Sequence, residues 1–538
     1  MIQPLTVPEE GAPKPAFYSL RPPVFAVDRG VVVAGTSLGS VAGAEMLRRG
    51  GTATDAAIAA SAVQSVVMPH MGGPGGDMFL MHLDGRGGAT CLLAAGAAPR
   101  EASLPLFRQR GTRMPEQGVL SVSVPGLVGG WFAALERFGR LPYGEVFGQA
   151  IDYAERGFPL HKNFVRYLGT RHFRSQVEVD EGLERAFGPT SLSFGAVHKQ
   201  PQLANTLREL AAGGERTFYR GAIAEILSKA VRRRQGLLSL DDLARFEIEW
   251  AEPVSIDVWN WRIHQTPPPS QGVAMLEILK IAEQIGLDQL RLNSVEYLTQ
   301  LTEAMKVALE DRNVSVCDPR FAAVDTDRLL SVSHATAAAD AIQACHRLAT
   351  NDPSADGSTT CVVAADSAGD AVALVQSLGD EFGSGVYVEE LGFALQNRMK
   401  GFTLEPNHSN CVQGGKRPLH TLCPSAAIST DGTRLVLATP GGGTQPQTLA
   451  QVFMNLVCFG LDLQEAIESP RVALQGKHVL IENRLADAAR ALDEGGSLVA
   501  ELPAWSSVVG GCAGIQIRPD GIRIAGADPR RDSYAIPQ

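Results

Sequence analysis

The sequence of 538 residues lacks any stretch typical of a secretory leader or a membrane anchor. Residues 1–20 contain prolines and glutamates, with no basic start followed by an apolar core. The most apolar window, residues 56–68, is too short to cross a bilayer and is interrupted by Ser61, Gln64 and Ser65. We therefore expect a cytoplasmic protein without a membrane partner.

Paired cysteines and long basic runs are also missing. The eight cysteines are scattered, with no C-x-x-C pair and no histidine at metal-ligand spacing, so we expect reduced thiols and no metal site. The net charge of −10 argues against nucleic acid as a partner. The densest basic run, residues 232–234, ends a predicted helix, where cations suit the helix dipole.

No nucleotide-binding glycine motif is complete. In the loop 35–39, Ser37 stands where the second glycine of a dinucleotide fingerprint would approach pyrophosphate. The glycine-dense loop 72–76 is not followed by the lysine and hydroxyl residue of a phosphate-binding loop. We interpret both loops as tight turns beside packed helices and expect no cofactor. A nucleotide-binding protein stays as an alternative.

Hydrophobic periodicity predicts elements along most of the chain. Strands are expected at 31–34, 78–82, 359–366, 370–378 and 435–438, and helices at 36–49, 54–67, 143–155, 203–212, 223–233, 271–285, 294–312 and from near Thr448. The segment from about 140 to 345 is predicted to be mostly helical. Residues 346–358 are polar and rich in turn formers, which indicates an exposed, flexible segment.

A hydroxyl pair, Thr359 and Thr360, opens a β-branched run that ends in the predicted turn 366–369. Two threonines at a strand's start ordinarily reflect β-propensity alone. One chemistry, however, requires a threonine there: if the chain is cut before it, the new α-amine becomes the general base for the threonine hydroxyl. The loop 439–444 contains three glycines between a predicted strand and a helix, and its unhindered N–H groups could form an oxyanion hole.

Eight short motifs, in order, resemble those of the γ-glutamyltransferase family, whose members are N-terminal-nucleophile hydrolases. The motifs lie at 48–57, 72–79, 124–126, 268–272, 311–319, 415–418, 440–442 and 528–530. The resemblance implies an α+β fold, a four-layer αββα sandwich. It also implies a precursor that cuts itself between Ser358 and Thr359. A large chain, 1–358, and a small chain, 359–538, would then form one interleaved domain.

The resemblance also assigns roles in catalysis. Thr359 would be the nucleophile, the N–H groups of Gly441 and Gly442 would hold the oxyanion, and Ser377 would orient the new amine. Thr360 is the weaker nucleophile candidate, because alignment on the turn that follows places Thr359 at the cut.

The residues that hold the γ-glutamyl group in the family are replaced in this sequence. The aligned substrate-binding positions are Ala95, Gly379, Arg398, Gly401, His420 and Thr421. Ala95 stands where the family has a carboxylate-binding arginine, and Gly401 where it has the acid that holds the α-amine. Each lost charged hydrogen bond is worth about 1.5–3 kcal/mol. We therefore expect a rebuilt pocket in which Arg398 and His420, with Arg417 as a further candidate, bind an anion without an α-amino group. A surface ion pair for Arg398 and purely structural roles for His420 and Arg417 are the alternatives.

These observations predict a self-processing amidohydrolase or acyltransferase that acts on a small-molecule amide through an ester on Thr359. The acyl group is either γ-glutamyl or, alternatively, a desamino or small-amide group, as in the glutaryl-cephalosporin acylases and oxamate amidohydrolases of the family. A family member that folds without reacting, and serves as a scaffold, is a further alternative. Pairing of subunits into a homodimer is left open.

Overall fold

The computed structural model describes residues 19–188, 192–344 and 358–538. The segment that we expect to be flexible, 346–358, lies outside these ranges apart from Ser358. Residues 1–20, where we expect no secretory leader, also lie outside them apart from residues 19 and 20.

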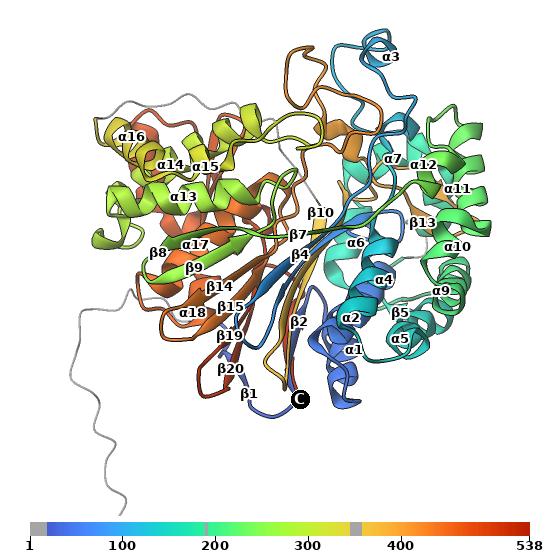
Figure 1. Cartoon of the computed structure of the whole chain (residues 1–538), viewed down its shortest axis with the longest axis horizontal. Coiled ribbons are helices and arrows are strands. Elements are labelled where there is room, and N and C mark those ends of the chain that lie inside the picture. Colours follow the sequence, from blue (N-terminus) through green and yellow to red (C-terminus); the bar gives the residue numbers. More distant parts are fainter. Residues whose placement is uncertain (1–18, 189–191, 345–357) are drawn as a thin grey trace, which may run out of the picture.

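Two antiparallel sheets, each of seven strands, are stacked face to face in the described part of the chain (Figure 1). The first sheet has the order β1 (Val24–Ala26), β20 (Arg523–Ala527), β19 (Ala513–Ile517), β15 (Arg434–Ala438), β14 (Ser425–Ser429), β9 (Trp261–Gln265) and β8 (Val254–Val258). The second has the order β21 (Tyr534–Pro537), β2 (Gly30–Ala34), β10 (Ser358–Asp366), β11 (Ala371–Gly379), β3 (Asp77–Leu83), β4 (Ala89–Ala94) and β7 (Glu249–Ala251).

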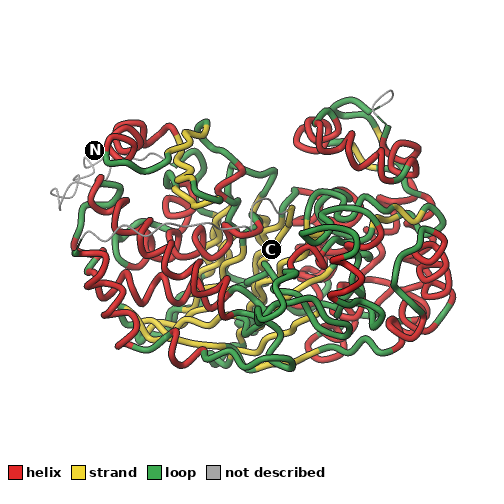
Figure 2. Tube along the Cα trace, turned by 90° about the horizontal axis from the view of Figure 1, so that it is seen from above, coloured by secondary structure: helices red, strands yellow, loops and turns green. Residues whose placement is uncertain are grey.

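Helices cover the outer face of each sheet, on opposite sides of the strands (Figures 1 and 2). On the second sheet lie α1 (Ser37–Arg48), α2 (Ala53–Val67), α4 (Leu127–Phe138) and α5 (Tyr143–Arg156), with α9 (Pro201–Gly213), α10 (Glu215–Arg220) and α11 (Ala222–Arg233) beyond them. On the first sheet lie α13 (Gly272–Ile285), α14 (Val295–Ser315), α16 (Val332–Gln343), α17 (Gln445–Val457), α18 (Leu463–Glu468) and α19 (Ala486–Glu494). The expected four-layer αββα sandwich is thus confirmed.

Shorter elements complete the described chain. They are α3 (Leu104–Arg108), α6 (Lys162–Leu168), α7 (Arg171–Val179), α8 (Glu181–Phe187), α12 (Leu240–Ala244), α15 (Thr326–Leu329), β5 (Phe158–Pro159), β6 (Val197–His198), β12 (Tyr387–Val388), β13 (Phe393–Ala394), β16 (Val472–Gln475), β17 (His478–Glu482) and β18 (Val499–Leu502).

Side chains on each strand of the second sheet alternate between two cores. On β10, Cys361, Val363 and Ala365 pack between the two sheets. Val362 and Ala364 point the other way and pack against the helices. Successive strand residues face opposite sides of a sheet, so Thr359 belongs to the face between the sheets and Thr360 to the face toward the helices.

Segments before and after Thr359 share both sheets. In the second sheet, β10 and β11 are inserted between β2 and β3, and in the first sheet β14 pairs with β9. The sandwich core therefore depends on residues from both 1–358 and 359–538.

Most predicted helices and strands are present, with shifted ends. A capping box between Thr52 and Asp55 starts α2 at Ala53, and α17 begins at Gln445 instead of Thr448 because Pro446 suits a helix's first turn. The middle of the chain was predicted to be mostly helical. It also contributes the hairpin β8–β9, which pairs with β14 at the first sheet.

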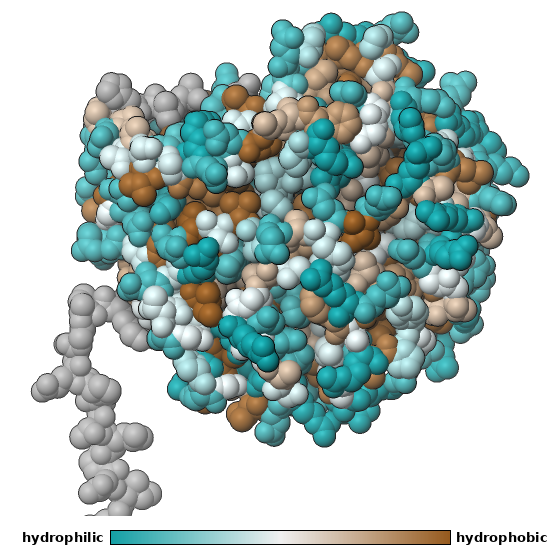
Figure 3. Space-filling model, viewed as in Figure 1, coloured by the Kyte–Doolittle hydropathy of each residue, from teal (hydrophilic) through white to brown (hydrophobic). Residues whose placement is uncertain are grey.

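No helix within the described ranges is both long and apolar enough to cross a membrane. The cysteines in those ranges are free thiols, and Cys345 lies outside them. On the face seen in Figure 3, apolar residues are scattered among hydrophilic ones.

Candidate active site

Thr359 begins a row of side chains that crosses the second sheet. Thr359 pairs with Ser377 on β11, and Ser377 pairs with Asp77 on β3. Adjacent strands lie about 4.8 Å apart, so the three side chains are neighbours on the face between the sheets. Ala95 immediately follows Ala94, the partner of Met78, and extends the row by one position. Residues far apart in sequence thus lie side by side near one end of these strands.

The two threonines have different surroundings. The Thr360 hydroxyl donates a hydrogen bond of 2.5 Å to Oε1 of Gln64, on the helical side of the sheet. Thr359 is 2% exposed, and its Oγ1 has no hydrogen-bond partner among the described residues. Of the pair, Thr359 is the one whose hydroxyl is not engaged in a hydrogen bond among the described residues, and its role as nucleophile stays a prediction.

The peptide bond before Thr359 is held by Ser377. The Ser377 hydroxyl donates a hydrogen bond of 2.6 Å to the carbonyl oxygen of Ser358 and accepts one of 2.8 Å from the N–H of Gly379. The strand register shifts between Ser358 and Thr359, a bulge of the kind often found beside active sites. The donated bond polarises the carbonyl that Thr359 would attack.

The glycine loop leaves β15 beside the start of β10. The Cys361 thiol lies 3.5 Å from the carbonyl oxygen of Ala438, the last residue of β15. Beyond it, Gly441 and Gly442 have φ angles of +131° and +54°, in the region that favours glycine. No hydrogen bond among the described residues uses the N–H of Gly441 or of Gly442. Two unpaired donors are what an oxyanion requires.

Gln271 anchors this loop, a role that the sequence did not reveal. Its Nε2 donates to the carbonyl oxygens of Gly442 and Thr421, at 2.8 and 2.7 Å. Its Oε1 accepts a bond of 2.8 Å from Nη1 of Arg312. Gln271 lies within the motif 268–272, but the motif by itself gave no indication that the side chain reaches the glycine loop.

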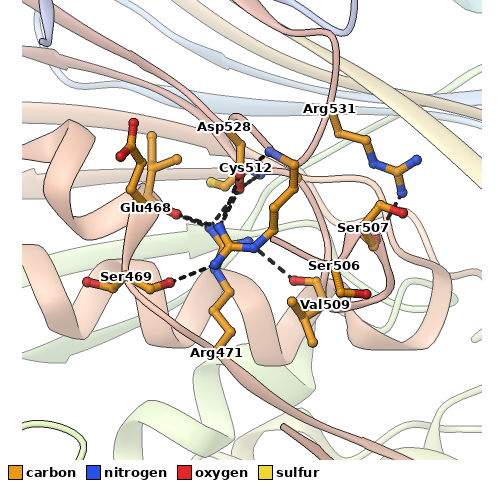
Figure 4. Close-up of polar contacts among 12 residues, drawn as sticks. Glu468, Ser469, Arg471, Ser506, Ser507, Val509, Cys512, Asp528 and Arg531 are labelled. Carbon is orange, nitrogen blue, oxygen red and sulfur yellow. Dashed lines mark hydrogen bonds and ion pairs between the residues drawn. The ribbon is translucent and has the colours of Figure 1, made fainter. Parts of the chain in front are cut away.

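A buried ion-pair network holds residues 509–512 (Figure 4). Nη2 of Arg471 lies 2.8 Å from Oδ2 of Asp528, which also accepts the N–H of Cys512 at 3.0 Å. Nη1 of Arg471 donates to the carbonyl oxygen of Val509. These contacts fix residues 509–512. The segment packs closely against the glycine loop, since a Cβ added at Gly441 would lie only 3.4 Å from the Cα of Gly510.

Arg398 and Thr421, two of the predicted pocket residues, are in contact beside Asp77. Nη1 of Arg398 donates 2.9 Å to the hydroxyl of Thr421, and its Nε lies 3.9 Å from Oδ2 of Asp77. The side chain is 8% exposed, and its Nε and Nη2 have no hydrogen-bond partner among the described residues. Arg398 is thus buried with unused donors, which differs from a surface ion pair.

His420 does not carry the positive charge expected of it. Its Nε2 lies 3.2 Å from Oδ2 of Asp77, and its Nδ1 accepts the N–H of Leu422 at 3.3 Å. Burial, with Arg398 and Arg417 nearby, lowers the pKa of the ring well below its usual value. His420 is therefore a neutral side chain that positions Asp77, whose own pKa burial raises to about 7 against the opposing effect of Arg398.

The predicted glycines provide space and do not offer side-chain contacts. Gly379 has φ +99°, and a Cβ there would lie 2.0 Å from Oδ1 of Asn397, which occupies that volume. Gly401 accepts a hydrogen bond of 2.5 Å from Nδ2 of Asn410 through its carbonyl oxygen. Ala95 is buried between the sheets with no polar group to offer.

Arg417 belongs to the protein's framework. Its Nη1 lies 2.5 Å from Glu249 and its Nη2 3.2 Å from Asp318. Two carboxylates thus neutralise Arg417, in line with the structural alternative for this residue, whereas Arg398 has only the long ion pair with Asp77.

No free carboxylate stands beside Arg398 to hold a substrate amine, among the described residues. Asp380 is paired with Lys400 and accepts a bond of 2.7 Å from Nδ2 of Asn397. Asp77 is engaged by His420 and by the N–H of Gly126 at 2.9 Å. The charges of the site thus favour an anion over an ammonium group.

Comparison with known proteins identifies the relatives of this chain. It is 32% identical to a glutathione hydrolase-like proenzyme, YwrD, of Bacillus subtilis (strain 168), over 94% of this chain and 98% of that protein. It is 33% identical to the oxamate amidohydrolase proenzyme of Klebsiella pneumoniae subsp. pneumoniae, with the same two coverages. The solved structure of a cephalosporin acylase from Bacillus halodurans superposes with a TM-score of 0.89 at 30% identity, covering 100% of this chain and 99% of that one. The sequence model of the gamma-glutamyltranspeptidase family matches residues 39–538, and the chain belongs to that family.

Proposed function

We propose that the protein is a self-processing amidohydrolase that uses Thr359 as its N-terminal nucleophile and prefers acyl donors with a free carboxylate and no α-amine. The observation that carries the preference is Arg398, a buried guanidinium whose Nε and Nη2 have no hydrogen-bond partner in the described part of the chain. Its ion pair with Asp77 is long, at 3.9 Å, and its Nη1 binds only the Thr421 hydroxyl, so the guanidinium keeps donors that an anion can use.

Maturation begins with attack of the Thr359 hydroxyl on the carbonyl carbon of Ser358. The C–N bond breaks, the hydroxyl proton passes to the departing nitrogen, and an ester joins Ser358 to Thr359. Ser377, which donates to the Ser358 oxygen, stabilises the negative charge of the tetrahedral intermediate. Water then hydrolyses the ester and leaves a carboxylate on Ser358 and a free α-amine on Thr359.

Turnover uses that amine as the base. An α-amine has a pKa of about 7.7–8, so a useful fraction is neutral near pH 7. It takes the proton of the Thr359 hydroxyl during acylation and returns it to the leaving amine. The N–H groups of Gly441 and Gly442 hold the oxyanion, and water releases the acyl group from the ester. Transfer to an acceptor amine would follow the same path in reverse.

The acyl group extends from Thr359 along the row toward Asp77 and Arg398. With two strand spacings of about 4.8 Å between Thr359 and Asp77, a donor of several bonds can reach both ends. The names of two relatives, oxamate amidohydrolase and cephalosporin acylase, are consistent with an amide-cleaving family branch. We also propose that both products of the cut stay together in one domain, and that the enzyme works in the cytoplasm, where free thiols persist.

A matched series of p-nitroanilides tests this preference in the mature enzyme. Glutaryl, succinyl and oxalyl donors should have higher kcat/KM than the γ-glutamyl donor, and the best of them identifies the acyl length. Arg398→Met should raise KM for the carboxylate donors about 10- to 100-fold, because one charged hydrogen bond to the substrate is lost. The KM of a neutral butyryl donor should stay the same.

Arg262→Met, at an exposed arginine of β9, is the matched control and should change neither class of donor. Preferential turnover of γ-glutamyl-p-nitroanilide over every desamino donor would refute the proposed pocket. Equal effects of Arg398→Met on carboxylate and neutral donors would show that Arg398 acts through the fold alone.

A further inference from the structure

Three helices that cover the first sheet bring one histidine and two acids together. Nε2 of His334, on α16, lies 3.0 Å from Oε1 of Glu277 on α13 and 2.8 Å from Oδ2 of Asp311 on α14. One ligand atom from each residue lies within 4.8 Å of the other two. None of the three takes part in the proposed reaction.

Hydrogen-bond acceptors outnumber donors in this cluster. Glu277 is 1% exposed, and its second oxygen, Oε2, has no hydrogen-bond partner among the described residues. The single Nε2 of His334 faces both carboxylates and can donate at most one proton. A carboxylate buried to this degree requires a cation or a full set of donors, and here it shares a single imidazole with Asp311.

We propose that Glu277, Asp311 and His334 bind a divalent transition-metal ion. Zinc binds His nitrogen and carboxylate oxygen at about 2.0–2.2 Å, which places neighbouring ligands in a tetrahedron about 3.4 Å apart. The observed separations of 3.0 and 2.8 Å need only a small adjustment to reach that value. An imidazole nitrogen among the ligands favours zinc over magnesium and calcium, and the two carboxylates also suit manganese.

The site has an entry route and an open coordination position. Asp311 and His334 are 25% and 21% exposed, whereas Glu277 forms the buried floor. An ion can therefore arrive from solvent and keep a water as its fourth ligand.

The ion would join the helices behind the oxyanion loop. Gln271, which anchors the loop, is the N-cap residue of α13, and its partner Arg312 adjoins Asp311 on α14. A metal bridge between α13, α14 and α16 would fix this support without touching the substrate. We therefore assign the ion a structural role, independent of the identity of the acyl donor.

Titration of chelator-treated, full-length protein with ZnCl₂, and separately with MnCl₂, tests the site. Calorimetry and elemental analysis after gel filtration should give about one ion per chain, with a rise in the thermal midpoint. Glu277→Gln and Asp311→Asn retain the side-chain shapes and should each weaken binding at least about 100-fold. His478→Gln removes an exposed histidine of β17 and should leave binding unchanged.

Failure of the wild-type protein to retain either ion would overturn the proposal. So would binding that survives both Glu277→Gln and Asp311→Asn, or that disappears in His478→Gln. Circular dichroism of each variant checks its fold, and Asp311, as the more exposed acid, provides the variant with the smallest structural cost. Equal binding of MgCl₂ would contradict the predicted contribution of the imidazole.

Discussion

Ser377→Ala should slow maturation without preventing folding. The substitution removes the hydroxyl that donates 2.6 Å to the Ser358 carbonyl oxygen and accepts the N–H of Gly379. Loss of one donor to a developing oxyanion typically costs about 10²–10³ in rate, or about 2.7–4 kcal/mol of barrier. The rate constant for cleavage before Thr359 should therefore fall by that factor.

The assay follows freshly purified precursor over time on denaturing gels. The intact chain is replaced by fragments 1–358 and 359–538, and the fraction cut gives a first-order rate constant. Ser377→Thr keeps the hydroxyl and should mature at a rate much closer to that of the wild type. A denaturant titration of each precursor separates a slow reaction from a loss of folded protein.

Ser425→Ala is the matched control. Ser425 is also buried on a strand and donates to a backbone carbonyl, that of His264 at 3.3 Å, but it lies on β14 in the other sheet. It should mature normally at a similar cost in stability. If Ser377→Ala precursor is cut at the wild-type rate, the hydrogen bond to Ser358 has no part in the cleavage.

Three further outcomes are expected. Gln271→Ala in the mature enzyme should lower kcat about 10²-fold, because the loop at Gly442 loses its anchor. Gln271→Glu should be equally slow, since a carboxylate cannot donate to the two carbonyl oxygens. Steady-state kinetics of both variants measure the loss. Gly379→Ala should lower the free energy of unfolding by more than the roughly 1–2 kcal/mol of a left-handed residue, because the new Cβ meets Asn397, and denaturant titration measures it. The pKa of Asp77 is raised from 3.8 to about 7, so the folded protein holds this proton more tightly than the unfolded chain. The resulting stability is present below about pH 4 and is lost as the pH rises through 7; Asp77→Asn should flatten this decline, and an unchanged slope would contradict the shift.

Local sequence was sufficient to predict the hairpin that carries Thr359. The turn between β10 and β11 has Gly369 at φ +88° and Asp366 capping the N–H groups of Ala368 and Asp370, as its turn chemistry predicts. The β-branched run fixes the strand because its alternate side chains fill two separate cores. Such signals are contained within a few residues and can be read without the fold.

The pocket was only partly predictable. Alignment named Arg398 and Thr421 as separate pocket positions, and the structure brings the two side chains into contact. The neutral state of His420, however, follows from its burial near Arg398 and Arg417, and its contact with Asp77 joins residues 343 apart in the sequence. Likewise, the role of Gln271 requires knowledge of where the glycine loop passes. Pairings of this kind arise from strand register and helix packing, which no local pattern encodes.

The proposed metal ligands show the same limit. A search of the sequence for metal sites relies on short spacings between cysteines and histidines. Glu277, Asp311 and His334 come from three different helices, so their proximity follows from the packing of α13, α14 and α16 against one another.

Terminal sequencing and intact mass of the purified protein give the most direct test of the proposed chemistry. The mature small chain should begin Thr359-Thr360-Cys361, and Thr359→Ala should stay a single uncut chain without amidase activity. A wild-type preparation that remains one chain yet hydrolyses amides, or a new terminus elsewhere, would show that Thr359 is not the nucleophile.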